Sequence, residues 1–123
     1  CKECIQYIQS TISLSENEKV YNIDWLEYDD NIIYDFVFCI EVIEHVPKHL
    51  VFSFLKKIYA KTKRNLFLST PDMSRNSHGI FSKQEIQDML KEAGFNSVCV
   101  DWQWTNFYLC EKQELCQSNN III

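Results

Sequence analysis

The sequence predicts an α/β domain with parallel strands that ends in an antiparallel pair of strands. Of the 123 residues, 46% are hydrophobic and 24% are charged, a balance typical of chains that bury a core. Short apolar runs rich in β-favouring residues alternate with stretches of helical periodicity, the order expected for parallel strands joined by helices. Two β-rich segments, 97–104 and 106–111, then follow each other closely enough to form a hairpin.

The first third of the chain contains one expected helix and two expected strands. Residues 1–13 carry a helical stripe of apolar side chains, namely Cys4, Ile5, Ile8 and Ile12. Residues 19–24 (KVYNID) indicate a short strand. After a polar, acidic connection, residues 36–40 (FVFCI) form a continuous apolar run. Such a run predicts a strand buried on both faces, as in a parallel sheet.

The middle of the chain predicts a helix followed by another buried strand. Pro47 suits the first turn of a helix, where its missing N–H costs nothing. The core-facing stripe of this helix consists of Leu50, Val51, Phe54, Leu55 and Ile58. Residues 65–70 (NLFLST) then predict a strand that Pro71 closes.

The last predicted helix has a complete set of start and stop signals. Ser82 is its expected N-cap, and Glu85, three residues later, completes a capping box. Phe81 and Ile86 occupy the two positions of a hydrophobic staple. Gly94 stands where a glycine ends a helix in the left-handed conformation. Residues 1–113 are therefore expected to form one domain, with 114–123 as a C-terminal tail.

Composition and charge argue against several classes of function. With 2 glycines, this stretch has no glycine-rich phosphate loop. A net charge of -5 and a pI near 5.1 argue against general nucleic-acid binding, which requires a basic surface. No apolar stretch approaches the roughly 20 residues of a membrane span, and no signal-peptide pattern is present. The 6 cysteines do not cluster in loops, which favours reduced thiols and a cytoplasmic location.

The densest cluster of ionisable residues directly follows the strand FVFCI. Glu41, Glu44 and His45 lie where such a strand ends, and ligands of open α/β sheets bind beyond the carboxyl ends of strands. His45 is a candidate general base, because imidazole exchanges a proton near neutral pH, and Glu44 is a second candidate catalytic residue. The alternative is a solvated helix N-terminus, where the helix dipole favours carboxylates.

Three segments resemble a known family in order and separation. They are YDFVFCIEVIEHV at 34–46, NLFLSTPD at 65–72 and FSKQEIQDMLKEAGF at 81–95. Together they resemble the class I S-adenosylmethionine-dependent methyltransferases, over about residues 1–113. The resemblance implies a doubly wound, Rossmann-like sheet that ends in an antiparallel hairpin. It also implies methyl transfer from S-adenosylmethionine to an unidentified oxygen or nitrogen acceptor.

The resemblance also implies residues that contact the cofactor. Asp24 matches an acidic residue that contacts the adenine amine, and Trp25 beside it is placed to pack on the adenine face. Cys39 and Ile40 would border the sulfonium end, through their backbone more than their side chains. A turn-forming role for Asp24 and a plain core role for Trp25 are the alternatives.

The family's glycine-rich loop and its ribose-binding acid would both precede Cys1. We therefore expect at least one βαβ unit, roughly 30 residues or more, to lie outside this sequence. A sheet that lacks the N-terminal glycine-loop unit is not expected to form a complete cofactor pocket on its own.

A subset of the family uses an E-x-x-E-H pattern to bind a divalent cation. This subset includes small-RNA 2′-O-methyltransferases and some quinone-biosynthesis O-methyltransferases. The matching residues here are Glu41, Glu44 and His45, with His78 as the later ligand of the RNA enzymes. Carboxylates with imidazole suit Mg²⁺ or Mn²⁺. Many metal-free members share the pattern, so a metal-free His45 stays the alternative, and the acidic charge does not favour RNA as acceptor.

An alternative function that is not enzymatic is that of a catalytically inactive remnant of the fold. Such a chain would act by binding a protein partner through an exposed sheet edge.

Overall fold

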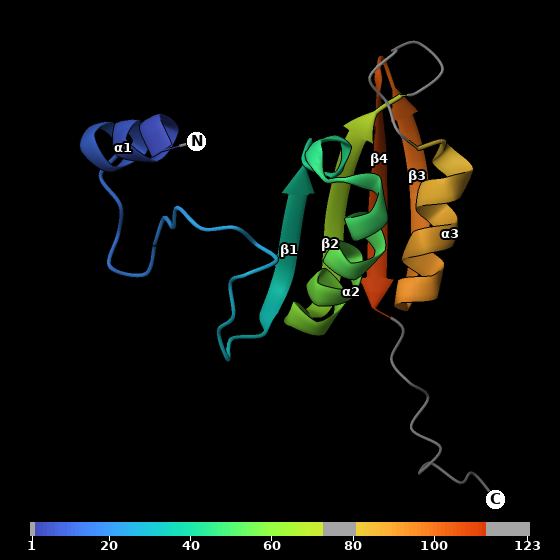
Figure 1. Ribbon diagram of the computed structural model, residues 1–123, viewed down its shortest axis with the longest axis horizontal. Coiled ribbons are helices and arrows are strands. Elements are labelled where there is room, and N and C mark those ends of the chain that lie inside the picture. The colour runs from blue at the N-terminus through green and yellow to red at the C-terminus, as the bar shows by residue number, and fades with distance from the viewer. Residues whose placement is uncertain (1, 73–80, 113–123) are drawn as a thin grey trace, which may run out of the picture. The chain divides into compact units, whose positions relative to one another are not determined.

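The computed structural model describes residues 2–72 and 81–112, and it divides the chain into two units (Figure 1). Cys1–Asp30 forms the first unit and Asn31–Ile123 the second. The predicted tail at 114–123 lies outside the described residues, as does His78.

The first unit contains the predicted N-terminal helix, α1, which spans Lys2–Thr11. None of its residues is buried. Within this unit the apolar stripe of α1 therefore has no core against which to pack.

The strand expected at 19–24 is absent, and this prediction was wrong. Residues 19–22 have no regular structure, and a turn begins at Asp24. The Asp24 carbonyl accepts the backbone N–H of Tyr28 at 2.9 Å and that of Glu27 at 3.1 Å. A strand needs a neighbouring strand to satisfy its backbone, and no described strand pairs with this segment. A short segment without such a partner does not become a strand.

The second unit is built on a four-stranded mixed sheet in the order β1-β2-β4-β3. Its strands are β1 (Tyr34–Ile40), β2 (Thr62–Pro71), β3 (Phe95–Trp102) and β4 (Thr105–Lys112). β1 pairs with β2 in parallel, whereas β4 runs antiparallel to both β2 and β3. This arrangement confirms the predicted α/β fold with a terminal hairpin.

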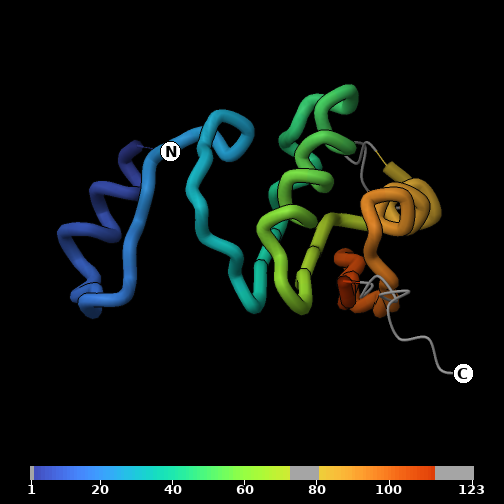
Figure 2. Tube along the Cα trace, turned by 90° about the horizontal axis from the view of Figure 1, so that it is seen from below, coloured from blue at the N-terminus to red at the C-terminus, as the bar shows by residue number. Residues whose placement is uncertain are grey.

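Two helices cover one face of this sheet. α2 spans Val51–Lys61 and α3 spans Lys83–Ala93. Figure 2 shows both on the same side of the strands. The core lies between this face and the helices, and its largest fully buried members include Tyr108, Phe95, Ile43, Leu55, Leu66, Leu68, Ile86 and Leu90.

α3 begins and ends as its sequence predicts. The Ser82 Oγ accepts the Glu85 N–H at 3.2 Å, and the Glu85 Oε2 accepts the Ser82 N–H at 2.7 Å. Gly94 has a φ of 115° and donates its N–H to the Leu90 carbonyl. A Cβ at Gly94 would also approach the Tyr59 ring to 2.7 Å. Glycine is therefore required there by both conformation and space.

The expectation that β1 is buried on both faces was wrong. Cys39 lies in the core, but Phe36, Phe38 and Ile40 on the opposite face are 49%, 68% and 52% exposed. Both helices of the second unit lie on the Cys39 side. No described element of this unit covers the other side of β1 (Figure 1).

The described cysteines behave as small apolar residues. Cys4, Cys39, Cys99 and Cys110 are all free thiols. Burial raises the pKa of Cys39 and that of Cys110 from 9.0 to about 12, so both stay protonated and pack as hydrophobes. Among residues 2–72 and 81–112, no helix has the length and apolar character needed to cross a bilayer.

Candidate functional site

The chain turns sharply at Glu41, directly after β1. Glu41 has a φ of 52°, in the left-handed region that side chains other than glycine rarely adopt. Its N–H donates to the Ser69 carbonyl at 3.1 Å and to the Ser69 Oγ at 3.2 Å. The Ser69 hydroxyl in turn donates to the Glu41 Oε1 at 2.7 Å. Ser69, near the end of β2, thus holds both the backbone and the carboxylate of a strained residue.

The next turn places Glu44 and His45 side by side. Both belong to a short 3-10 helix, η1 (Ile43–His45), whose Ile43 is completely buried. The Glu44 side chain is 10% exposed, whereas the His45 side chain is 79% exposed. The Glu44 Oε1 lies 3.8 Å from the His45 Nε2. A nearly buried carboxylate therefore stands beside an imidazole that solvent and ligands can reach.

The second carboxylate oxygen of Glu44 is unsatisfied. Its Oε2 is buried, and no residue in 2–72 or 81–112 donates a hydrogen bond to it. Burial raises the pKa of Cys39, and the negative charge of Glu44 adds to that rise. A buried acceptor without a donor is costly. The Glu44 Oε2 is therefore a buried acceptor without a donor among the described residues.

The three ionisable residues do not form a metal site. Among the described residues, no three His, Cys, Asp or Glu side chains are arranged to hold a metal ion. Glu41 is engaged by Ser69, Glu44 is turned into the protein, and His45 is exposed. The structure thus does not bring Glu41, Glu44 and His45 together as metal ligands, and the fourth expected ligand, His78, lies outside the described residues. Metal binding by these four residues stays a prediction.

The predicted cofactor residues fall in both units. In the first unit, the Asp24 Oδ1 accepts the Leu26 N–H at 2.9 Å, which is the turn-forming role named as the alternative. The Trp25 ring lies 6.3 Å from that of Tyr28. Asp24 also helps to line an open surface depression, together with Asn22, Ile23, Glu27, Tyr28 and Asp29.

In the second unit, Cys39 points into the core, so only its backbone remains at the strand end. Ile40 lies exposed on the opposite face. Cofactor binding by Asp24, Trp25, Cys39 and Ile40 stays a prediction.

Ser69 is the site residue that sequence reasoning missed. Ser69 follows the apolar residues Leu66–Leu68 and was assigned to a strand and to the family-like segment at 65–72, but not to the site. The available signal was a polar side chain where a parallel strand ends, because such ends meet at one edge of the sheet.

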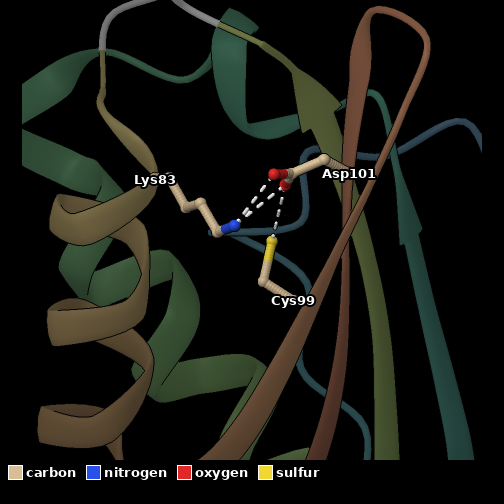
Figure 3. Close-up of polar contacts among 3 residues, drawn as sticks. All are labelled: Lys83, Cys99 and Asp101. Carbon is tan, nitrogen blue, oxygen red and sulfur yellow. Dashed lines mark hydrogen bonds and ion pairs between the residues drawn. The ribbon is translucent and has the colours of Figure 1, made fainter.

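A second polar cluster lies where α3 meets β3 (Figure 3). The Lys83 Nζ lies 3.0 Å from both carboxylate oxygens of Asp101, and the Cys99 Sγ lies 3.5 Å from the Asp101 Oδ1. Burial is the larger cause that raises the pKa of the Cys99 thiol, and the hydrogen bond to Asp101 raises it further. A thiol held protonated is a poor nucleophile. This cluster therefore joins a helix to a strand and offers no reactive group.

Comparisons with known proteins place the fold. No protein-family model matches the sequence, and no curated protein matches it. Several solved structures, however, are similar to this chain. Magnesium protoporphyrin IX methyltransferase from Synechocystis PCC 6803, with bound SAH, aligns with a TM-score of 0.68 at 15% identity, covering 90% of this chain and 58% of that chain. An S-adenosylmethionine-dependent methyltransferase from Clostridium acetobutylicum ATCC 824 aligns with a TM-score of 0.68 at 9% identity. The alignment covers 87% of this chain and 68% of that chain.

A third similar structure is the Pnkp1/Rnl/Hen1 RNA repair complex. It aligns with a TM-score of 0.62 at 14% identity, covering 90% of this chain and 28% of that chain. The chain thus spans 58% of the magnesium protoporphyrin IX methyltransferase and a smaller share of the repair protein. These likenesses, together with the mixed sheet and its terminal hairpin, show that this chain has the fold of part of a class I S-adenosylmethionine-dependent methyltransferase.

Proposed function

We propose that this chain is part of an enzyme that transfers a methyl group from S-adenosylmethionine to an oxygen or nitrogen atom of an acceptor. Two observations support the proposal. The fold is that of part of a methyltransferase. The single observation that carries the chemistry is the pair formed by Glu44 and His45, a nearly buried carboxylate 3.8 Å from an exposed imidazole, directly beyond β1.

In this proposal His45 removes the proton of the acceptor. When bound, S-adenosylmethionine supplies a methyl group on a positively charged sulfur, which leaves as a thioether. The imidazole takes the proton that the attacking oxygen or nitrogen loses. Glu44 then stabilises the imidazolium, because opposite charges attract more strongly where water is partly excluded. Ser69 and Glu41 shape the turn that carries both residues.

The test is the transfer of a labelled methyl group from S-adenosylmethionine to components of a cell extract. We expect transfer by a form that includes any further part of the fold, and its loss in His45→Ala. Lys83→Gln, which changes the charge in the second cluster, is the matched control and should retain activity. If the His45→Ala variant were as active as the unaltered protein, His45 would not be the general base. If no form of the protein transferred a methyl group, the proposal of an enzyme would be wrong.

The proposal does not specify RNA as the methyl acceptor, and it does not include a metal-dependent reaction. The chain covers 28% of the RNA repair protein, and the described residues hold no group suited to a metal. A net charge of -5 also works against a polyanionic acceptor.

Protein binding is a second candidate function, favoured by the open edge of β1. Among the described strands, β2 alone pairs with β1, so no described strand lies along the other edge of β1. An extended segment of a partner could add a strand there. A chain that never transfers a methyl group, yet gains a protected β1 edge in hydrogen exchange when a partner binds, would favour this function over catalysis.

A further inference from the structure

Ser69 is the polar member of an otherwise apolar row of neighbouring side chains. The strand register places it between Ile40 of β1 and Phe107 of β4, with Val100 of β3 beyond Phe107. Ser69 is 1% exposed, so water does not satisfy its hydroxyl. An apolar residue would meet the demands of burial in this row without a polar group to satisfy. The hydroxyl therefore calls for an explanation other than packing.

The Ser69 hydroxyl forms two hydrogen bonds with one residue, and it acts as donor in one and as acceptor in the other. It donates its proton to the Glu41 Oε1 at 2.7 Å, and its oxygen accepts the Glu41 N–H at 3.2 Å. An alanine side chain can form neither bond, and a cysteine thiol is both a weak donor and a weak acceptor. The two bonds therefore depend on the hydroxyl group and not on the size of the side chain.

These bonds fix one end of the turn that carries Glu44 and His45. They hold Glu41 at a φ of 52°, and this angle sets the direction in which the chain leaves β1. The chain then continues into η1, whose Ile43 is completely buried and forms a second anchor. The Glu44 carboxylate and the His45 imidazole, 3.8 Å apart, follow from these two anchors. Release of the anchor at Ser69 would leave the pair held from one side.

We propose that Ser69 is a positioning residue for the methyl transfer, whose hydroxyl sets the backbone of Glu41 so that the His45 imidazole stays beside the Glu44 carboxylate. This inference rests on the proposed function, in which His45 takes the proton of the acceptor. Ser69 itself touches neither the acceptor nor the cofactor. Because proton transfer depends steeply on the placement of the base, a displaced turn should slow the reaction more than it weakens binding.

The first test is the nuclear magnetic resonance signal of the His45 ring, measured in the 123-residue chain at one fixed pH. Glu44→Gln removes the carboxylate charge and defines the signal of the imidazole without its partner. Ser69→Ala should move the signal at least half of the way to that value. Ser69→Cys fills the space but lacks a strong hydrogen-bonding group, so it should act as Ser69→Ala does. Ser69→Thr keeps the hydroxyl and should restore the original signal.

Ser82→Ala is the matched control, because it removes a hydroxyl that accepts a hydrogen bond at the start of α3, away from the turn. It should leave the His45 signal unchanged, and circular dichroism checks that each variant is folded. The proposal is overturned if Ser69→Ala leaves the His45 signal in place, or if Ser82→Ala moves it as far. Should Ser69→Thr fail to fold, the contrast between Ser69→Cys and Ser82→Ala decides.

The second test is the kinetics of a form that transfers the labelled methyl group. Ser69→Ala should lower kcat at least tenfold and leave the KM for S-adenosylmethionine within a factor of two. An unchanged kcat overturns the proposal, whether or not KM rises, because Ser69 would then not position the base. If no form transfers a methyl group, the proposed function fails, whereas the His45 signal still decides whether Ser69 holds the pair in place.

Discussion

Ser69 and Glu41 join the ends of two parallel strands by hydrogen bonds in both directions. The Ser69 hydroxyl donates to the Glu41 carboxylate at 2.7 Å, and the Glu41 N–H is shared by the carbonyl and hydroxyl oxygens of Ser69. Because Ser69 is 1% exposed, water does not replace these bonds easily. They hold Glu41 in a backbone conformation that it would not adopt alone.

Removing the hydroxyl should therefore destabilise the turn after β1. We expect Ser69→Ala to lower the free energy of unfolding by about 1 kcal/mol, the usual net contribution of a hydrogen bond. Within Ser69→Ala, Glu41→Gly should restore part of that loss, because glycine adopts a positive φ without strain. Urea unfolding of both variants measures this. A Glu41→Gly change that destabilises the Ser69→Ala protein further would show that Glu41 is not strained.

The capping box predicts a local effect at the start of α3. Ser82→Ala should cost about 1 kcal/mol, within a range of 0.5–2, because the Glu85 backbone N–H loses its acceptor, the Ser82 Oγ. Ser53→Ala is the matched control, since Ser53 is exposed inside α2 and alanine is the better helix former there. Equal losses in the two variants, compared by thermal and urea unfolding, would contradict the capping argument.

The two faces of the sheet should respond very differently to loss of volume. Leu66→Ala, on the covered face, should cost about 2–5 kcal/mol of unfolding free energy, because Leu66 is completely buried. Leu109→Ala, on the opposite face of the sheet, should cost less than about 1 kcal/mol, since that side chain is 49% exposed. Urea unfolding of both variants provides the comparison. Similar costs would mean that Leu109 is covered in the folded protein.

Stability should fall as the solution becomes alkaline. The folded protein holds the pKa of Cys39 and that of Cys110 at about 12, above the ordinary 9.0. The unfolded chain therefore binds fewer protons than the folded chain above about pH 9, and the free energy of unfolding decreases as pH rises. Burial also raises the pKa of Tyr108, with the same sign.

Unfolding measured from pH 8 upward, to about pH 11, should show this decline. Cys39→Ala combined with Cys110→Ala should make it shallower, although both changes lower stability at neutral pH. An unchanged slope in the double variant would show that other groups cause the decline.

Divalent cations should not stabilise this chain. A metal bound only by the folded state raises the melting temperature by mass action, but the described residues offer no suitable set of ligands. Adding Mn²⁺ should therefore leave the melting temperature unchanged. A rise that Glu44→Gln abolishes would instead restore the metal site that the E-x-x-E-H pattern suggests.

Local sequence signals predicted the hairpin and most of the helical boundaries, but α2 begins at Val51 rather than at Pro47, which instead precedes a short 3-10 helix at Lys48–Leu50. The capping of α3 depends on Ser82 and Glu85, three residues apart, and its end depends on Gly94. Such features are governed by backbone hydrogen bonds and dihedral preferences within a few residues, so sequence alone suffices. The motif that follows β1 was also placed correctly at a strand end, because a run of β-favouring residues identifies a strand even though it does not show which faces are buried.

The amino-acid sequence by itself determined the order of most elements, the ends of α3 and the position of Glu41, Glu44 and His45 beyond a strand. The tertiary structure decided which of these residues meet. Glu41 meets Ser69 because β1 and β2 align in parallel, and Glu44 is 10% exposed beside the fully buried Ile43. It also decided that 19–24 is not a strand and that Phe38 is exposed. Strand pairing and burial depend on which segments lie alongside one another, and this information is not contained in the local pattern of any one segment.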